Sequence, residues 1–208
     1  KAEFELLQAQ INPHFLYNTL DAIIWLAEAG EQKWVVGMVR NLSDFFRTSL
    51  NQGKDINSIK EEMLHVKSYL EIQHVRYQDI LSYDIEVPEA LYIYSIPKIT
   101  IQPLVENALY HGIKNKRGMG HISIRGEAGE KDFTITVTDD GIGIDETRLR
   151  QVQSGIQNKV LTGKDFYGLY NVCERIRLNF GEEYGIFIES VYGEGTSVRV
   201  ILPYVEAK

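Results

Sequence analysis

Apolar residues in the first part of the chain recur every three or four positions, which is the period of an amphipathic helix. Three such stretches occur, at about residues 2–29, 38–50 and 63–72. Gly30 and Gly53 stand where helices are expected to end. The pattern therefore predicts a helical region over residues 1–79.

Beyond residue 80 the period shortens to two, which is typical of half-buried strands. The clearest case is residues 133–138, where apolar residues alternate with threonines. Further strands are predicted at residues 81–87, 122–124, 186–189 and 197–202. Helices are predicted at residues 101–109, from their apolar spacing, and at residues 169–178, ending near Gly181. This order predicts an α+β chain, in which the helical region is followed by an α/β sandwich, residues 80–208, whose mixed sheet carries helices on one face.

Composition and charge narrow the class of protein. The 208 residues are 44% hydrophobic and 25% charged, as in globular proteins, and suffice for one or two domains. A net charge of −7 argues against general nucleic-acid binding. The one cysteine, Cys173, cannot form an internal disulfide, which fits a reducing compartment. No apolar run reaches the about 20 residues that cross a membrane. The first residues are not a signal peptide, and the chain does not begin with Met, so we expect it to be part of a longer protein.

One histidine of the first predicted helix has the surroundings of a phosphoacceptor. Along the helix face the residues turn from apolar to polar at His14, and Pro13, directly before it, removes a backbone hydrogen bond and favours a bend that exposes the next side chain. A neutral imidazole carries a lone pair that can attack a phosphoryl group without a strong base. Asn18 lies one turn further on the same face and is predicted to orient the ring. From spacing alone, an ordinary surface or core histidine is the alternative.

The segment around this histidine, residues 7–20, reads LQAQINPHFLYNTL and resembles the phosphoacceptor signature of LytS/YesM-type bacterial sensor histidine kinases. In that family the histidine of the NPHF segment carries the phosphate, so the resemblance assigns this role to His14. The commoner histidine kinases have an acidic residue directly after the histidine, where this chain has Phe15. The general base is therefore open, with Glu5, Asp21 and acids of the second half as candidates.

A predicted helix of the second half carries donors for a metal ion and for phosphates. Residues 102–114 read QPLVENALYHGIK, and their apolar face is predicted to point inward, which leaves Asn107, His111 and Lys114 on the other side. An amide oxygen suits Mg²⁺, which takes oxygen ligands and keeps several waters, and Lys114 is expected to pair with phosphates. The segment resembles the N box of the histidine-kinase, gyrase and Hsp90-like ATPases, whose asparagine holds Mg²⁺. The resemblance gives that role to Asn107.

An acidic turn with two glycines follows the clearest strand. Residues 137–143 read VTDDGIG. A carboxylate at the end of a strand can accept a hydrogen bond from an adenine amino group, and Gly141 and Gly143 let the backbone come close to the base. A turn without a ligand is the alternative, and the spacing of a calcium-binding EF-hand is absent. The segment resembles the G1 box of the same superfamily, which assigns adenine recognition to Asp139.

Two further segments resemble later motifs of this superfamily. In the segment FYGLYNV, a glycine before a helix leaves the backbone N–H groups of Gly168 and Leu169 facing an anion. The family has two glycines here, and Phe166 replaces the first. This replacement is expected to weaken the binding of the phosphates, or to change the packing of the mobile segment that covers them in the family, the lid. The polar residues 144–167 correspond to that lid, or to an ordinary surface loop. The segment GEGT, residues 193–196, is either the fourth motif or a hairpin turn.

The resemblance covers nearly the whole chain and implies a sensor histidine kinase core, with residues 1–79 for dimerisation and phosphotransfer and residues 80–208 for ATP binding. It implies ATP-dependent autophosphorylation of His14 with Mg²⁺, transfer to an aspartate of a response regulator, a homodimer built by the helices, and no nucleic-acid partner. It also implies a cytoplasmic domain of a bacterial inner- or plasma-membrane protein whose membrane-spanning segments lie upstream. The signal, the cognate regulator, phosphorylation in cis or in trans, and phosphatase activity are left open.

Two other functions fit parts of the sequence. An ATPase of the gyrase or Hsp90 kind places a glutamate one helical turn before the asparagine, as base for water, but this chain has Pro103 there. A pseudokinase that only binds nucleotide or a partner is favoured by the missing glycine at Phe166. The remaining side chains of chemical interest show no motif and are expected to pack or to lie at the surface: His65, His74, His121 and Cys173.

Overall fold

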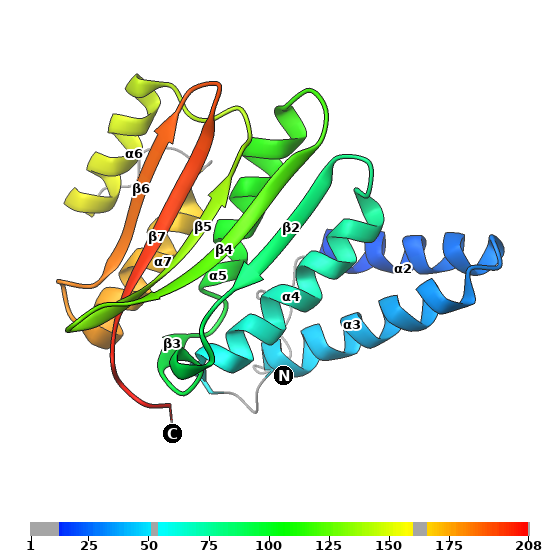
Figure 1. Ribbon diagram of the computed structural model, residues 1–208, viewed down its shortest axis with the longest axis horizontal. Coiled ribbons are helices and arrows are strands. Elements are labelled where there is room, and N and C mark those ends of the chain that lie inside the picture. The colour runs from blue at the N-terminus through cyan, green and yellow to red at the C-terminus, as the bar shows by residue number, and fades with distance from the viewer. Residues whose placement is uncertain (1–12, 51–53, 160–165, 208) are drawn as a thin grey trace.

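The computed structural model describes residues 13–50, 54–159 and 166–207 (Figure 1). Its first part contains three helices, as predicted: α2 (Pro13–Glu28), α3 (Gln32–Leu50) and α4 (Ile59–Arg76). Gly30 lies between the first two helices with a φ of 76°, a left-handed conformation that glycine adopts without strain. Residues 1–12, which include Glu5 and the first part of the phosphoacceptor signature, lie outside the described residues.

The helix α4 connects the two halves of the chain. It begins with a capping box, in which the Ser58 hydroxyl accepts from the Glu61 backbone N–H and the Glu61 carboxylate accepts from the Ser58 backbone N–H. The helix α3 packs against one side of α4, and α5 and β2 pack against another. The domain boundary that we place near residue 80 stays a prediction.

A five-stranded mixed sheet forms the second half. Its order is β2-β4-β5-β7-β6, in which β2 runs parallel to β4 and all other pairs are antiparallel. The strands are β2 (Leu81–Glu86), β4 (Gly120–Ala128), β5 (Asp132–Asp139), β6 (Gly185–Val191) and β7 (Gly195–Pro203). Each strand predicted from the sequence coincides with one of these.

Helices cover one face of this sheet, as predicted (Figure 1). They are α5 (Ile101–Asn107), α6 (Glu146–Asn158) and α7 (Tyr167–Phe180). Alternate residues of the central strands, such as Ile122, Phe133, Ile135 and Val200, are fully buried on this side. Their removal from water is the main force that holds the layers together. Among the described residues, no helix is long and apolar enough to cross a membrane.

Two elements differ from the sequence prediction. The short strand β1 (Ile56–Ser58) interrupts the region predicted to be helical and pairs with β3 (Ser95–Pro97). A three-residue strand has no readable period and depends on a partner far along the chain. The stretch 144–167, predicted to be a lid or a surface loop, contains α6, which Asp145 caps by accepting from the Arg148 backbone N–H. Because the sequence of this helix is mostly polar, its apolar residues do not show a clear helical period.

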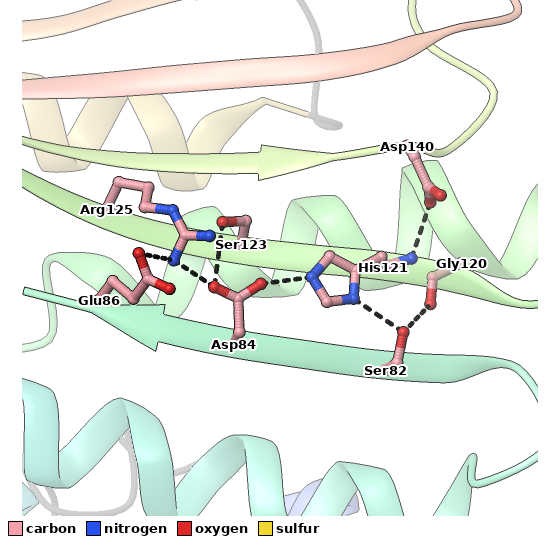
Figure 2. Close-up of polar contacts among 8 residues, drawn as sticks. All are labelled: Ser82, Asp84, Glu86, Gly120, His121, Ser123, Arg125 and Asp140. Atoms are coloured by element: carbon pink, nitrogen blue, oxygen red, sulfur yellow. Dashed lines mark hydrogen bonds and ion pairs between the residues drawn. The ribbon is translucent and has the colours of Figure 1, made fainter.

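The uncovered face of the sheet carries a polar cluster across the parallel pair β2–β4 (Figure 2). Asp84 lies between two cations or potential cations: Nε2 of His121 is 2.5 Å from its carboxylate, and Arg125 forms an ion pair with it. On its other side, Nδ1 of His121 lies 2.8 Å from the Ser82 hydroxyl. Partial desolvation opposes ionisation of Asp84, but the hydrogen bond from His121 and the charge of Arg125 prevail and lower its pKa. The cluster ties the edge strand to its neighbour.

Candidate active site

Residues from separate sequence motifs meet in one pocket between the end of α5, the start of α7 and the sheet. The pocket has a volume of about 270 Å³, at the lower end of the range for small-molecule sites. Asn107, His111, Asp139, Gly143 and Leu169 all line it. Side chains that the motifs predict to act together are therefore close together in space.

Asp139 lies at the end of β5, and only 6% of the residue is exposed. Its Oδ1 accepts a hydrogen bond from the Gly141 backbone N–H at 2.8 Å. Burial raises the pKa of this carboxyl to about 6, and the backbone N–H donors of Gly141 and Thr196 offset only part of that rise. At neutral pH the group is mostly ionised and can accept from an amino group in the pocket. Thr196, from the GEGT segment, also lines the pocket.

Glycines let the backbone close tightly around this aspartate. A Cβ on Gly141 would lie 2.4 Å from backbone atoms of Gly112 and 2.6 Å from Asp139 Oδ1. Gly143 has a φ of 68°, and its Cβ would lie 2.1 Å from the Val191 carbonyl oxygen. Gly143 lines the pocket, whereas Gly141 packs against Asp139 and donates its backbone N–H to that carboxylate.

The helix that carries Asn107 changes form at the pocket. The helix α5 ends at Asn107 and continues as a π-helical turn, Ala108–Gly112, and then as a 3-10 turn, Ile113–Asn115. π-turns are rare and occur frequently at functional sites. His111 lies in the π-helical turn and lines the pocket, and Lys114, in the 3-10 turn that follows, does not.

Lys114 lies outside the pocket, against two tyrosines. Its Nζ is 4.9 Å from the ring centroids of both Tyr77 and Tyr110, and 3.3 Å from the Tyr77 hydroxyl. The guanidinium of Arg76 also lies over the Tyr77 ring, at 5.1 Å. A cation over an aromatic face is attracted by the ring. The expected pairing of Lys114 with phosphates stays a prediction, and it requires this side chain to leave the two rings.

Phe166 lines the pocket at the position where the family has a glycine. Its ring is nearly parallel to that of His111, with 6.1 Å between centroids, and the Arg148 guanidinium lies 5.4 Å above it. Arg148 comes from the helix α6, which the sequence analysis missed, and it brings a cation to the pocket. Gly168 lies in the first turn of α7, where a Cβ would meet Pro103 at 3.6 Å, an ordinary contact. Packing therefore does not require glycine at this position, and Gly168 itself does not line the pocket.

The candidate phosphoacceptor is exposed on α2. The Asn18 amide nitrogen lies 2.9 Å from His14 Nδ1 and 3.3 Å from Nε2, so the predicted pair is in contact. Phe15, the next residue, is buried, with ring centroids 5.0 Å from Phe45 and 5.1 Å from Tyr69. Phe15 thus anchors α2 to α3 and α4.

The donor chemistry of the pocket suits one kind of metal ion. Within the described ranges, no group of three or more His, Cys, Asp or Glu side chains is placed to hold a metal by itself. Asn107 lines the pocket and carries an amide oxygen, a type of ligand that fits an ion which takes most of its ligands from phosphates and water. Mg²⁺ behaves in this way, so the residues present fit the ion that the resemblance implies.

Comparison with known proteins identifies the family. Residues 97–206 match the family of histidine kinase-, DNA gyrase B- and HSP90-like ATPases, and residues 2–81 match the histidine kinase family. The chain belongs to this ATPase family. The sensor histidine kinase YesM of Bacillus subtilis is 38% identical over 203 residues, which are 98% of this chain and 33% of YesM. The matches place this chain with the sensor histidine kinases, as the motifs predict, and the chain spans about a third of the length of the curated relatives it matches.

Solved structures share the fold of this chain. The histidine kinase domain of a blue-light activated kinase from Erythrobacter litoralis aligns with a TM-score of 0.54 at 14% identity, over 98% of this chain and 94% of that one. The histidine kinase ThkA, solved in complex with the response regulator protein TrrA, aligns with a TM-score of 0.52 at 16% identity, over 93% of this chain and 60% of that one. At these identities the alignments support the arrangement of helices and sheet, and nothing finer.

Proposed function

We propose that this chain is the kinase core of a sensor histidine kinase, which transfers the γ-phosphoryl group of ATP to His14 and from there to an aspartate of a response regulator. One observation carries the proposal: a single pocket gathers Asn107, His111 and Asp139 in a chain whose α2 exposes a histidine. The family match of residues 97–206 supports the use of ATP.

The pocket contains an acceptor that suits the adenine base and other side chains that suit the phosphates. Asp139 is buried and mostly ionised at neutral pH, so its carboxylate suits the adenine amino group. Arg148 and His111 flank the Phe166 ring and suit the phosphates. Catalysis of phosphoryl transfer rests mainly on such positioning and charge stabilisation. Asn107 would hold Mg²⁺ through its side-chain oxygen, and the bound ion would neutralise charge on the phosphate oxygens.

His14 supplies the nucleophile. A ring nitrogen attacks the γ-phosphorus through its lone pair, the bond to the β-phosphate oxygen breaks, ADP leaves, and the other ring nitrogen can release its proton to water. Asn18 lies within hydrogen-bond distance of the ring and would hold its orientation. Phe15 cannot act on the proton, and because it is buried between Phe45 and Tyr69 it fixes the helix on which the nucleophile sits.

The partners follow from the surface of the helices and from the relatives. The helices α2 and α3 expose large apolar side chains, among them Trp25 and Trp34, which suits a homodimer. The complex of ThkA with TrrA is the precedent for a response-regulator partner. Because the relatives are named sensor kinases and are about three times as long, we place this core on the cytoplasmic side of a longer bacterial membrane protein.

Incubation with γ-labelled ATP and Mg²⁺ tests the proposal. We expect label on the protein that is lost in acid and retained in alkali, as phosphohistidine requires, and no label on His14→Gln. As a matched control, His121→Gln replaces a histidine on the far side of the sheet and should be labelled as the wild type is.

Each other result favours a different function. Free phosphate without labelled protein would point to an ATPase, and bound nucleotide with neither product would point to a pseudokinase. Label that persists in His14→Gln would overturn the assignment of the phosphoacceptor. A protein that binds no adenine nucleotide would overturn the proposal altogether.

A further inference from the structure

The helix α4 presents a row of buried polar side chains to α5, the helix that carries Asn107. Glu62, His65, Tyr69 and Gln73 are spaced by three, four and four positions, so they lie on one face of α4. None of the four is more than 1% exposed. Polar side chains are rarely so completely buried unless partners satisfy them, so each of these four should have a specific contact.

The contacts run along both helices in step. The Glu62 carboxylate accepts from the Thr100 and Ile101 backbone N–H groups, at 2.7 and 2.9 Å, and so caps the first turn of α5. At the far end, the Gln73 amide donates to the Tyr110 hydroxyl at 3.2 Å. One face of α4 therefore contacts α5 along its whole length, from the first residue of α5 to the turn that follows Asn107.

His65 occupies the middle of this row and reaches α5 through Gln102. Its Nε2 lies 2.6 Å from Gln102 Oε1, and the Gln102 amide nitrogen donates to Glu106 at 2.9 Å. Because a carbonyl oxygen only accepts, Nε2 carries the proton and donates. Glu106 is the residue directly before Asn107, and burial raises the pKa of its carboxyl. The chain of contacts thus ends beside the candidate Mg²⁺ ligand.

The other ring nitrogen of His65 faces the helical hairpin. This nitrogen, Nδ1, lies 2.9 Å from the Thr48 hydroxyl of α3 and, at a longer distance of 3.5 Å, near the Ser49 hydroxyl of the same helix. The Phe45 ring stacks on the imidazole, with 4.6 Å between centroids. Phe45 in turn contacts Phe15, which directly follows the candidate phosphoacceptor. One buried imidazole therefore contacts both α3, against which the helix of the candidate phosphoacceptor packs, and α5, which carries Asn107.

We propose that His65 is a positioning residue for phosphoryl transfer, which fixes the α2–α3 hairpin relative to α5 through its short hydrogen bonds to Thr48 and Gln102. The proposal rests on the kinase function proposed above. Misplacement of reacting groups by about 1 Å can cost on the order of a hundredfold in rate, so a rigid link between hairpin and pocket matters to the reaction more than to nucleotide binding. Nucleotide contacts such as Asp139 lie on the sheet side and do not depend on this link.

Two substitutions of His65 and one control test the proposal in the full chain. His65→Leu removes both hydrogen bonds, and we expect the rate of His14 labelling at saturating ATP to fall about tenfold while the dissociation constant for ADP changes less than twofold. His65→Gln keeps an amide N–H near the position of Nε2 and should recover most of the rate. His74→Leu changes a histidine on the same helix that bonds the Leu81 carbonyl instead, and should behave as the wild type does.

A variant at the other end of the link guards against misfolding. Thr48→Val removes the hydroxyl that faces Nδ1, together with its hydrogen bonds to the Asp44 and Phe45 carbonyl oxygens, and keeps the side-chain shape. It should also slow labelling at saturating ATP, by about threefold, with ADP affinity unchanged. Thermal unfolding of every variant shows that the rates refer to folded protein. If His65→Leu does not fold, Thr48→Val decides.

The proposal is wrong if folded His65→Leu, or Thr48→Val in its place, is labelled within twofold of the wild-type rate. It is also wrong if ADP affinity falls as much as the rate does, because His65 would then serve the pocket alone. Absence of label on the wild type with ADP still bound is a different result, which overturns the proposed kinase function and not the observed link.

Discussion

Asp139 illustrates how a single residue acquires its properties from its surroundings. The same side chain in water has an ordinary pKa near 3.8, and burial at the end of β5 raises the pKa to about 6. Ionisation is therefore harder in the folded protein than in the unfolded chain. The stability that the protonated group contributes is present below about pH 4 and is lost as the pH rises through about 6. Because its ionised form is disfavoured by burial and so does not stabilise the fold, Asp139 suits a role in binding rather than in folding.

The titration of Asp139 predicts a pH dependence of nucleotide affinity. ADP affinity should be constant between about pH 7 and 8 and weaken as the pH falls below about 6, where the carboxyl becomes protonated. Calorimetric titration with ADP across this range measures the effect. Asp139→Asn should bind weakly at every pH while unfolding at no lower temperature than the wild type at pH 7. An unchanged pH profile in that variant would assign the dependence to another group.

Gly141 makes a second prediction at the scale of one residue. Gly141→Ala places a Cβ 2.4 Å from the Gly112 backbone, which cannot give way as a flexible side chain can. We expect a loss of about 1–3 kcal/mol in the free energy of unfolding, as for overpacked sites, and ADP binding about tenfold weaker because Asp139 is displaced. Gly37→Ala is the matched control: nothing lies within 4 Å, and alanine in a helix should stabilise by up to about 1 kcal/mol. Chemical denaturation compares the two.

At the scale of elements, α5 depends on a side chain from another helix. The first N–H groups of a helix have no partners within it, and here the buried Glu62 of α4 accepts from two of them. Arg175 of α7 donates to the Lys98 and Ile99 carbonyl oxygens just before that turn. The start of α5 is therefore hydrogen-bonded to side chains of two other helices, α4 and α7.

Loss of the Glu62 charge should weaken this junction measurably. Glu62→Gln keeps the size of the side chain but makes weaker hydrogen bonds, and we expect the free energy of unfolding to fall by about 1–3 kcal/mol. Denaturant unfolding measures it, with Glu130→Gln in the exposed β4–β5 turn as the control that should change little. Equal stability of both variants would mean that the capped N–H groups do not depend on a charged partner.

The edge strand β2 depends on the polar cluster of Figure 2 in a pH-dependent way. Because the folded-state pKa of Asp84 is lowered, its stabilising contribution is fully present above the unfolded value near 3.8 and is lost as the pH falls through the folded value. Asp84→Asn should therefore be less stable than the wild type at pH 7, and the difference should shrink below about pH 4. Thermal unfolding at several pH values follows both proteins. A difference that persists unchanged in acid would show that shape, and not charge, matters at this position.

For the whole molecule, the distribution of exposed apolar side chains predicts assembly. Several of them lie on the α2–α3 hairpin, and Trp25 is 65% exposed there. Such surfaces usually become buried in a complex. Light scattering after size-exclusion chromatography should show a dimer for the wild type and mainly monomer for Trp25→Glu. Phe187→Glu changes an apolar residue of similar exposure, 56%, on β6 and should stay dimeric. A monomeric wild type would remove the basis for the homodimer.

The sequence by itself determined the parts of this protein that depend on neighbours along the chain. The periods of three to four and of two set three N-terminal helices and five strands, because alternation and helical spacing record which face of each element is buried. The motifs pointed to Asn107, His111, Asp139, Gly143 and Leu169, and all five line one pocket, while their roles in binding stay predictions.

Only the tertiary structure decided what depends on distant partners. The strand β1 exists because β3 lies beside it, Lys114 lies outside the pocket against two tyrosines, and α6 adds Arg148 to the pocket. His65 has no motif, and its two short hydrogen bonds join residues 17 and 37 positions away. Local patterns record the burial of a residue but not the identity of its partner, since contacts over such distances form only when the chain is folded.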